Sequence, residues 1–266
     1  MTNKEILDNT KWSFSTLHMY EECPYSFYCK KLDDEKIGIG NFYAEAGIFA
    51  HEISADLFSS KITLDEAIDT WINTYNDRIC SDIKESTKEK KYYEMIDYLS
   101  SLDLSRMEKY EVLEIENRSE WTLGKYKMVG FIDMLIRDIS TQEIILIDHK
   151  SAGKFLKKDG TPLKNQASSF EAYKKQMHLY CMPIFEKYGD FPSKIVWNHF
   201  FAQEVTCIPF VEEEYVAAQK WAKDTIKKIH KDKVFKAHCF NEEVYKDNYV
   251  KCRYLCDYRE DCEYLS

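Results

Sequence analysis

The spacing of apolar and polar positions divides the chain into a mainly helical first part and a second part that mixes strands with helices. Apolar side chains that recur every three or four residues are typical of a helix with one buried face. This spacing predicts helices over residues 13–22, 44–58, 64–80, 88–104, 168–188 and 212–230.

Runs rich in β-branched residues and bounded by turn-forming residues are typical of strands. Such runs cover residues 112–121, 125–138, 143–151, 194–202 and 206–210, and turns are expected at 123–125 and 138–142. The order of helices and strands predicts an α/β (α+β) fold, with a central mixed β-sheet flanked by helices.

The chain has 266 residues, 44% of them hydrophobic, which favours a single domain over residues 1–266. It carries 46 acidic and 37 basic residues, a formal net charge of −9, so its surface is not generally basic. Any nucleic-acid contact therefore needs a local lysine or arginine patch. No window holds the roughly 18 uninterrupted apolar residues of a membrane span. The start of the chain is polar, and we expect a cytoplasmic protein without a membrane partner.

Two neighbouring predicted strands carry acidic residues within apolar runs. Asp133 lies in the run Gly130–Leu135, and the next strand ends in Asp148, His149 and Lys150. Because strand side chains alternate between two faces, Asp148 and Lys150 share a face. We expect the adjacent strand to bring Asp133 beside them.

This combination of side chains suits phosphodiester hydrolysis. Two carboxylates offer the oxygen ligands that Mg²⁺ prefers, and a lysine beside them can orient water and stabilise negative charge. The alternative is a strand that ends in a solvated turn, with Asp133 in a structural hydrogen bond. An isolated Asp-x-Lys string is common, so it does not decide between the two.

Two helical features add weight to the first interpretation. His51 follows Ile48 and Phe49 on a predicted helix, where a lone histidine is more often a core residue than a ligand. Gln176 and Tyr180 are four residues apart and therefore share one helix face, which alone indicates only a polar surface.

Taken in order, these motifs resemble the RecB-like branch of the PD-(D/E)XK nuclease superfamily, which includes CRISPR-associated exonucleases. The match runs from residue 13 to 262, and its motifs are Ser15…Leu17…Tyr20…Cys23-Pro24…Phe27, Gly47-Ile48-Phe49-Ala50-His51, Gly130-Phe131-Ile132-Asp133, Ile147-Asp148-His149-Lys150-Ser151 and Gln176-x-x-x-Tyr180. The resemblance implies a restriction-endonuclease-like catalytic core at about 109–210 and a helical insertion at about 60–108.

The resemblance also implies a role for each motif residue. His51, Asp133 and Asp148 would bind Mg²⁺ or Mn²⁺, and the main-chain carbonyl of His149 would complete the metal site. Lys150 would position or activate water, and Gln176 and Tyr180 would support the site or contact DNA. Glu52 is a weaker candidate ligand, because one helical residue turns it about 100° away from His51.

The C-terminal part of the chain is rich in cysteine. Cys252, Cys256 and Cys262 are spaced C-x3-C-x5-C, and Cys23 is a possible fourth thiolate from the other end of the sequence. The resemblance implies a 4Fe-4S cluster at these four residues, formed by the segment 239–262 with Cys23. Zinc is the alternative metal, Cys29 and Cys239 are alternative ligands, and reduced thiols without metal are a further alternative.

Basic and aromatic residues around the predicted site indicate what it binds. The lysines that follow or flank the acidic strand pair are Lys154, Lys157, Lys158, Lys164, Lys174 and Lys175, which make its rim locally basic. Phe155, Phe170 and Tyr173 are candidates for stacking on unpaired bases. The lysines between Lys223 and Lys236 are interpreted as the solvated face of a late helix.

Together these features predict a metal-dependent DNA exonuclease acting on single-stranded or frayed ends, in recombination, repair or mobile-element DNA processing. The alternatives are a non-catalytic DNA-binding or assembly subunit with the same fold and a structure-specific endonuclease. No helicase segment is recognised, so any unwinding would come from a helicase or a recombination or CRISPR partner protein.

Overall fold

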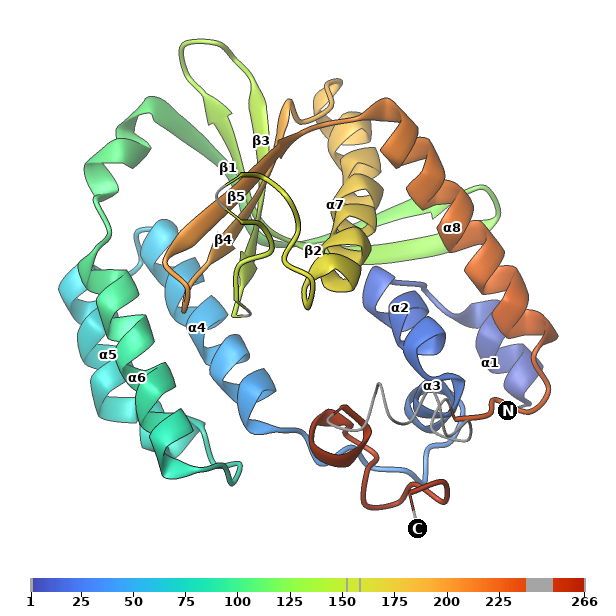
Figure 1. Ribbon diagram of the computed structural model, residues 1–266. Helices are drawn as coiled ribbons and strands as arrows, with labels where there is room; N and C mark the ends of the chain where they lie inside the picture. Colours follow the sequence, from blue (N-terminus) through green and yellow to red (C-terminus); the bar gives the residue numbers. More distant parts are fainter. Residues whose placement is uncertain (1, 152, 158, 238–250, 266) are drawn as a thin grey trace. The chain divides into compact units, whose positions relative to one another are not determined.

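The computed structural model describes residues 2–151, 153–157, 159–237 and 251–265 (Figure 1). Within these residues the helices are α1 (Asn3–Asn9), α2 (Phe14–Glu22), α3 (Pro24–Lys31), α4 (Phe42–Phe58), α5 (Leu64–Arg78), α6 (Glu85–Ser100), α7 (Ala167–Tyr188) and α8 (Glu212–Lys231), with short helical turns at η1 (Leu104–Lys109) and η3 (Lys251–Leu255). The strands are β1 (Tyr110–Leu123), β2 (Tyr126–Asp138), β3 (Ile144–Lys150), β4 (Lys194–His199) and β5 (Glu204–Pro209).

The chain forms two compact units. One, here called the sheet unit, comprises Phe42–Ser119 and Gly130–Val216. The other, here called the terminal unit, comprises Met1–Asn41, Glu120–Val129 and Ala217–Ser266. No helix in the part of the chain that the structure describes is long and apolar enough to cross a membrane.

The five strands form one mixed sheet in the order β1-β2-β3-β4-β5. Strands β2 and β3 are antiparallel, with Met134 opposite Ile147. Strands β3 and β4 are parallel, with Asp148 opposite Trp197, and β5 returns antiparallel to β4. The predicted mixed sheet with flanking helices is therefore confirmed.

The two faces of the sheet pack against different helices. Ile145, Ile147 and Val196 belong to a cluster that includes Phe58 of α4. On the opposite face, the ring of Trp197 lies 5.6 Å from that of Phe170 on α7. Asp148 shares a face with Trp197 because the two are register partners. The acidic end of β3 therefore faces α7, while α4 covers the other side.

Helices α4, α5 and α6 lie side by side in the sheet unit (Figure 1). Their shared core is strongly aromatic: Phe49 of α4 stacks on Trp71 of α5 at 5.0 Å, and Trp71 lies 4.9 Å from Tyr75. Trp71 is fully buried, and its indole N–H donates to the carbonyl of Tyr92 on α6. This core fixes α4, the helix that carries His51.

In the terminal unit, α2 and α3 meet at a proline. The Ser13 hydroxyl accepts from Thr16 N at 3.1 Å and starts α2, whereas Cys23 precedes Pro24 and so adopts extended backbone. Pro24 then opens α3 because its fixed φ suits a first helical position. The apolar spacing predicts α2 but neither α3 nor α1. Helix α1 begins with a Thr2–Glu5 capping box.

Candidate active site

Asp133 lies on β2 at the point where β3 ends beside it. The main-chain N–H of His149 donates to Oδ2 of Asp133 at 2.7 Å. Only 12% of the Asp133 side chain is exposed. The hydrogen bond from β3 fixes this carboxylate beside the end of β3, where α4 and β1 also contribute side chains.

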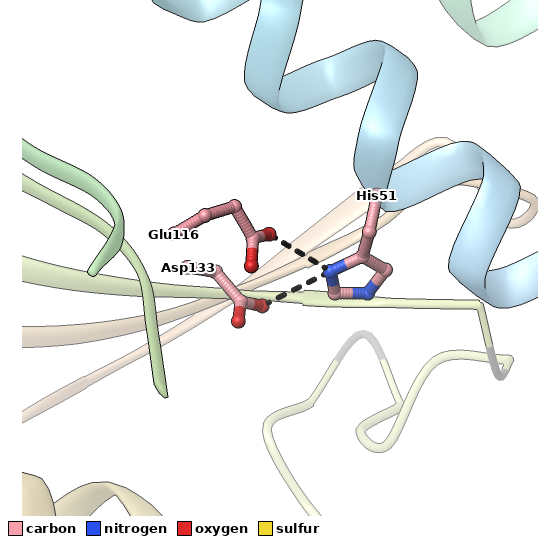
Figure 2. Close-up of side chains that lie close together, drawn as sticks. All are labelled: His51, Glu116 and Asp133. Atoms are coloured by element: carbon pink, nitrogen blue, oxygen red, sulfur yellow. Dashed lines mark ion pairs between the residues drawn. The ribbon is translucent and has the colours of Figure 1, made fainter. Parts of the chain in front are cut away.

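His51 and Glu116 point toward Asp133 from α4 and β1 (Figure 2). Nδ1 of His51 lies 3.5 Å from Oε1 of Glu116 and 3.6 Å from Oδ2 of Asp133. One ligand atom from each of the three residues lies within 4.8 Å of the others. Two carboxylates and an imidazole therefore converge on a space large enough for one cation.

Glu116 was not predicted from the sequence. It is one of several acidic residues on β1, and nothing in its spacing separates it from Glu111 or Glu114. Its backbone has φ 45°, a left-handed conformation that is uncommon for a non-glycine residue. A local departure from extended backbone redirects a strand's side chain, and such departures are frequent beside active sites.

Asp148 and Lys150 form an ion pair on the face that the strand alternation predicted. Nζ of Lys150 lies 2.7 Å from Oδ2 of Asp148, and both side chains are largely buried. The same ammonium lies 4.0 Å above the ring of Tyr173 on α7. Asp148 thus faces Lys150, whereas the carboxylates nearest His51 are those of Asp133 and Glu116.

Helix α7 holds Lys150 in place through Gln176. Nζ of Lys150 donates to Oε1 of Gln176 at 3.4 Å, and Nε2 of Gln176 donates to the hydroxyl of Tyr180 at 3.3 Å. The Tyr180 ring lies so close to Gly130 that a Cβ at that position would collide with it. The predicted pair on one helix face is therefore joined to Lys150 by hydrogen bonds.

The charged groups of the site shift one another's ionisation. Burial and the neighbouring Asp148 raise the pKa of Asp133 to about 7. Burial opposes protonation of His51, but Glu116, Asp133 and Asp148 outweigh it and raise the pKa of His51. Burial likewise opposes the charge on Lys150, yet Asp148 and its neighbours raise its pKa, so Lys150 is an ammonium.

The His149 side chain lies beside His51, with the centroids of the two rings 5.9 Å apart. Burial lowers its pKa to about 3, so the imidazole is neutral. Its Nδ1 accepts from Nδ2 of Asn198 at 3.1 Å, and its ring stacks on Phe58 and Phe200. The main-chain N–H of His149 contacts Asp133, and ligation of a metal by the His149 carbonyl stays a prediction.

The donor set fits a divalent cation. Carboxylate oxygens suit Mg²⁺ and Mn²⁺, and an imidazole is a common ligand of transition metals. Burial first, and then the charge of Asp148, raises the pKa of Asp133, and a bound cation would offset both effects. Glu52, the residue after His51, instead pairs with Arg78, as its predicted orientation requires.

A cavity of about 650 Å³ lies beside His51 and Glu116. Its lining includes Tyr43 and Ile48 of α4, whose side chains are 43% and 59% exposed. Glu52 and Asp56 form part of the same wall. The space next to the cation-binding group is thus partly apolar and partly acidic.

The predicted basic rim is only partly free of acidic partners. Lys154 pairs with Glu204 at 2.6 Å, and Lys174 pairs with Glu171 and Glu214. Lys157 and Lys164 are exposed, whereas Lys158 lies outside the described residues.

Two of the three aromatic residues proposed to stack on bases belong to the core. Phe155 is fully buried and Phe170 is 7% exposed, and both pack against Trp197. That interpretation was wrong because the loop after β3 folds back over the sheet and encloses Phe155. Tyr173 is half-buried beneath Lys150.

The four predicted cluster cysteines all belong to the terminal unit. Burial raises the pKa of Cys256, and Cys23 and Cys262 lie near enough to raise it further. Cys252 lies in η3, four residues before Cys256. Among the described residues no three thiols lie within 4.8 Å of one another. Cys29 is buried, and Cys239 lies outside the described residues.

This chain is similar to one protein-family model and to solved structures. No curated protein matches this chain. A solved structure described as the crystal structure of SSO0001 is similar over 82% of this chain and 96% of its own, with 16% sequence identity and a TM-score of 0.34. The family model of the PD-(D/E)XK nuclease superfamily matches residues 11–263. This match covers nearly the whole sequence, and the chain belongs to the PD-(D/E)XK nuclease superfamily, whose members are generally nucleases that use divalent metals.

Proposed function

We propose that this protein is a metal-dependent DNA exonuclease of the RecB-like branch, acting on single-stranded or frayed ends. The observation that carries the proposal is the convergence of His51, Glu116 and Asp133 beside the Asp148–Lys150 ion pair. A non-catalytic DNA-binding subunit has no use for a buried lysine held against a carboxylate next to a cation-binding group.

Each residue has a distinct part in this proposal. His51, Glu116 and Asp133 would hold a divalent cation such as Mg²⁺ or Mn²⁺, with Asp148 as a further carboxylate at its edge. A bound divalent metal supplies charge stabilisation at the phosphate and makes water a better nucleophile at neutral pH. Lys150 is an ammonium, which has donors but no acceptor, so it orients water or a phosphate oxygen and takes no proton.

The cavity beside His51 favours an unpaired strand. Tyr43 and Ile48 expose apolar surface next to the site, and a nucleobase can pack there once it has left the double helix.

Cleavage of end-labelled DNA tests the proposal. Single-stranded DNA, double-stranded DNA and a closed single-stranded circle are incubated with Mn²⁺ or Mg²⁺, and with the Asp133→Ala variant as control. We expect metal-dependent loss of linear single strands, an intact circle and no cleavage by the variant. Cleavage of the circle would establish the endonuclease alternative, and DNA binding without any cleavage would establish the non-catalytic one.

We also propose a 4Fe-4S cluster at Cys23, Cys252, Cys256 and Cys262, which would stabilise the terminal unit. Cys256 is partly buried near Cys23 and Cys262, and a bound metal stabilises a thiol as its thiolate. A zinc site holds its thiolates about 3.8 Å apart, given Zn–S bonds of about 2.3 Å. A cubane cluster binds each thiolate through a different iron and so accommodates wider separations.

Metal analysis of anaerobically purified protein distinguishes the alternatives. Iron and inorganic sulfide in equal amounts, lost in a Cys256→Ser variant, are expected for the cluster. Stoichiometric zinc without iron would identify the alternative metal, and absence of both would contradict a metal site. Cys181→Ser, at a buried cysteine of the sheet unit, serves as the control.

A further inference from the structure

A hollow of about 520 Å³ in the terminal unit gathers positive charge from separate parts of the sequence. Three stretches line it: residues 7–12, the tip of the β1–β2 hairpin at 125–127, and the end of α8 at 227–231. The basic residues among them are Lys125, Lys127, Lys227, His230 and Lys231. Asp8 is the single acidic residue of the described lining.

The lysines of α8 extend this positive surface along the helix. Lys223, Lys227 and Lys231 are four residues apart and so form one stripe. The Lys223 side chain lies beside the hairpin tip. Its Cε is 4.0 Å from the position that a Cβ on Gly124 would occupy. From the sequence alone these lysines fit the solvated face of a helix, but the hairpin adds Lys125 and Lys127 beside them.

The hairpin tip is fixed to the rest of the terminal unit by main-chain hydrogen bonds. Trp12 N donates to the carbonyl of Lys127 at 2.8 Å, and Val129 N donates to the carbonyl of Trp12 at 2.7 Å. The Trp12 ring is buried and lies 5.9 Å from that of His230 on α8. Lys125 and Lys127 therefore project from a hairpin tip that main-chain hydrogen bonds hold in place.

Much of this charge has no acidic partner. His230 pairs with Asp8 at 3.7 Å, and Lys227 pairs with Asp224 at 3.0 Å. Across the part of the chain that the structure describes, no ion pair is found for Lys125, Lys127, Lys223 or Lys231. The C-terminal end of a helix favours cations, which accounts for Lys231. This effect of a helix end does not account for the lysines of the hairpin. Their grouping is notable because the chain as a whole has a net charge of −9.

We propose that this hollow and the adjoining lysine stripe bind the phosphodiester backbone of the substrate DNA strand, through residues other than the catalytic ones. From Lys223 to Lys231 the helix rises about 12 Å, at about 1.5 Å per residue, which spans several phosphates of a strand. A single inorganic phosphate would engage only part of that length. This inference rests on the proposed function, because it assigns the substrate strand as the occupant.

The test compares two double variants with a matched control. Lys125→Gln/Lys127→Gln removes the hairpin charges, Lys223→Gln/Lys231→Gln removes the stripe, and Lys88→Gln/Lys90→Gln removes two charges from α6 of the sheet unit. Affinity for a labelled single strand is measured with chelator present over a range of salt concentrations. Losing two phosphate contacts is expected to reduce the slope of log K against log salt by about 1.4.

The expected result is a lower salt slope and an affinity about tenfold weaker at low salt for both pocket variants, with the control unchanged. An unchanged slope in the pocket variants would overturn the proposal. So would lysine-dependent binding of pyrophosphate without any effect on DNA, which would indicate a site for small anions.

A second assay separates this inference from the proposed function. Hydrolysis of bis(4-nitrophenyl) phosphate with Mn²⁺ needs no contact outside the active site, and the pocket variants should retain the wild-type rate. If wild-type protein hydrolyses no phosphodiester but binds DNA through these lysines, the proposed function fails and the hollow remains a DNA site. If wild-type protein cleaves DNA and the variants bind it normally, only this inference fails.

Discussion

Nζ of Lys150 lies 2.7 Å from Oδ2 of Asp148, the residue two positions earlier on β3. Because the two side chains share a face and are largely shielded from water, their attraction is stronger than that of a surface pair. Gln176 accepts from the same ammonium and restricts its position. Lys150 is thereby held beside the Asp148 carboxylate. His51, Glu116 and Asp133 converge from α4, β1 and β2.

Glu116 is expected to contribute to cation affinity. Replacing it by glutamine removes the charge but preserves size, and should weaken Mn²⁺ binding by about tenfold or more, as for other groups that support a metal. Isothermal titration with Mn²⁺ measures this directly. The control is Glu111→Gln, an exposed residue of the same strand that pairs with Arg137. Equal affinity in Glu116→Gln and wild-type protein would exclude Glu116 from the site.

Metal affinity is expected to fall as the pH decreases through about 7. Burial and Asp148 raise the pKa of Asp133 to about 7, and a carboxylate must lose its proton to bind a cation. In the metal-free protein the same raised pKa means that the folded state binds more protons than the unfolded state between pH 3.8, the ordinary pKa of an aspartate, and about pH 7. The contribution of Asp133 to stability therefore declines as pH rises through that window.

Thermal unfolding with and without Mn²⁺ checks this relationship. The stabilisation by metal should be larger at about pH 8 than at about pH 6, because the metal replaces a proton at the lower pH. The Asp133→Asn variant should lose both the metal effect and its pH dependence. A metal effect that is the same at both pH values would contradict the shifted ionisation of Asp133.

Gly130 is expected to be required for the packing of Tyr180. A Cβ at residue 130 would overlap the tyrosine ring, so Gly130→Ala should lower the free energy of unfolding by about 1–3 kcal/mol. In a Gly130→Ala/Tyr180→Ala double variant the methyl group has room, so the two losses should not add. Urea unfolding of all four proteins measures the coupling. Fully additive losses would show that the two residues do not interact.

Tyr43 and Ile48 are expected to favour single-stranded substrates. Tyr43→Ala should reduce kcat/KM on single-stranded DNA by about tenfold, because stacking of a base is worth about 1–3 kcal/mol. Hydrolysis of bis(4-nitrophenyl) phosphate, which has no nucleobase, should be unchanged. Tyr93→Ala, at a 60% exposed tyrosine of α6, is the control. An equal loss on both substrates would mean that Tyr43 supports the active site itself.

The parts of the site that follow from regular secondary structure were predictable from the sequence. Strand alternation placed Asp148 and Lys150 on one face, and helical spacing joined Gln176 to Tyr180. Local chemistry explains the helices that were missed: a capping box at Thr2 and a proline that ends one helix and begins another.

The remaining parts depend on backbone conformation and long-range packing. Glu116 reaches His51 from a left-handed residue within β1, and no periodic pattern predicts such a departure. Phe155 is buried because a loop closes over Trp197 and His199, which its sequence neighbours do not reveal. The lysines of the hairpin and of α8 meet only after about a hundred intervening residues have folded.

Separating metal binding from hydrolysis tests the central claim most directly. Lys150→Met keeps His51, Glu116 and Asp133 in place but removes the ammonium that orients the reacting groups. Single-turnover cleavage of labelled single-stranded DNA is measured with saturating Mn²⁺, alongside the Mn²⁺ affinity of the same samples. The account predicts a cleavage rate lower by a factor of about 10² or more, with metal still bound. Cleavage at the wild-type rate by Lys150→Met, or by Asp133→Ala, would contradict a nuclease centre at these residues.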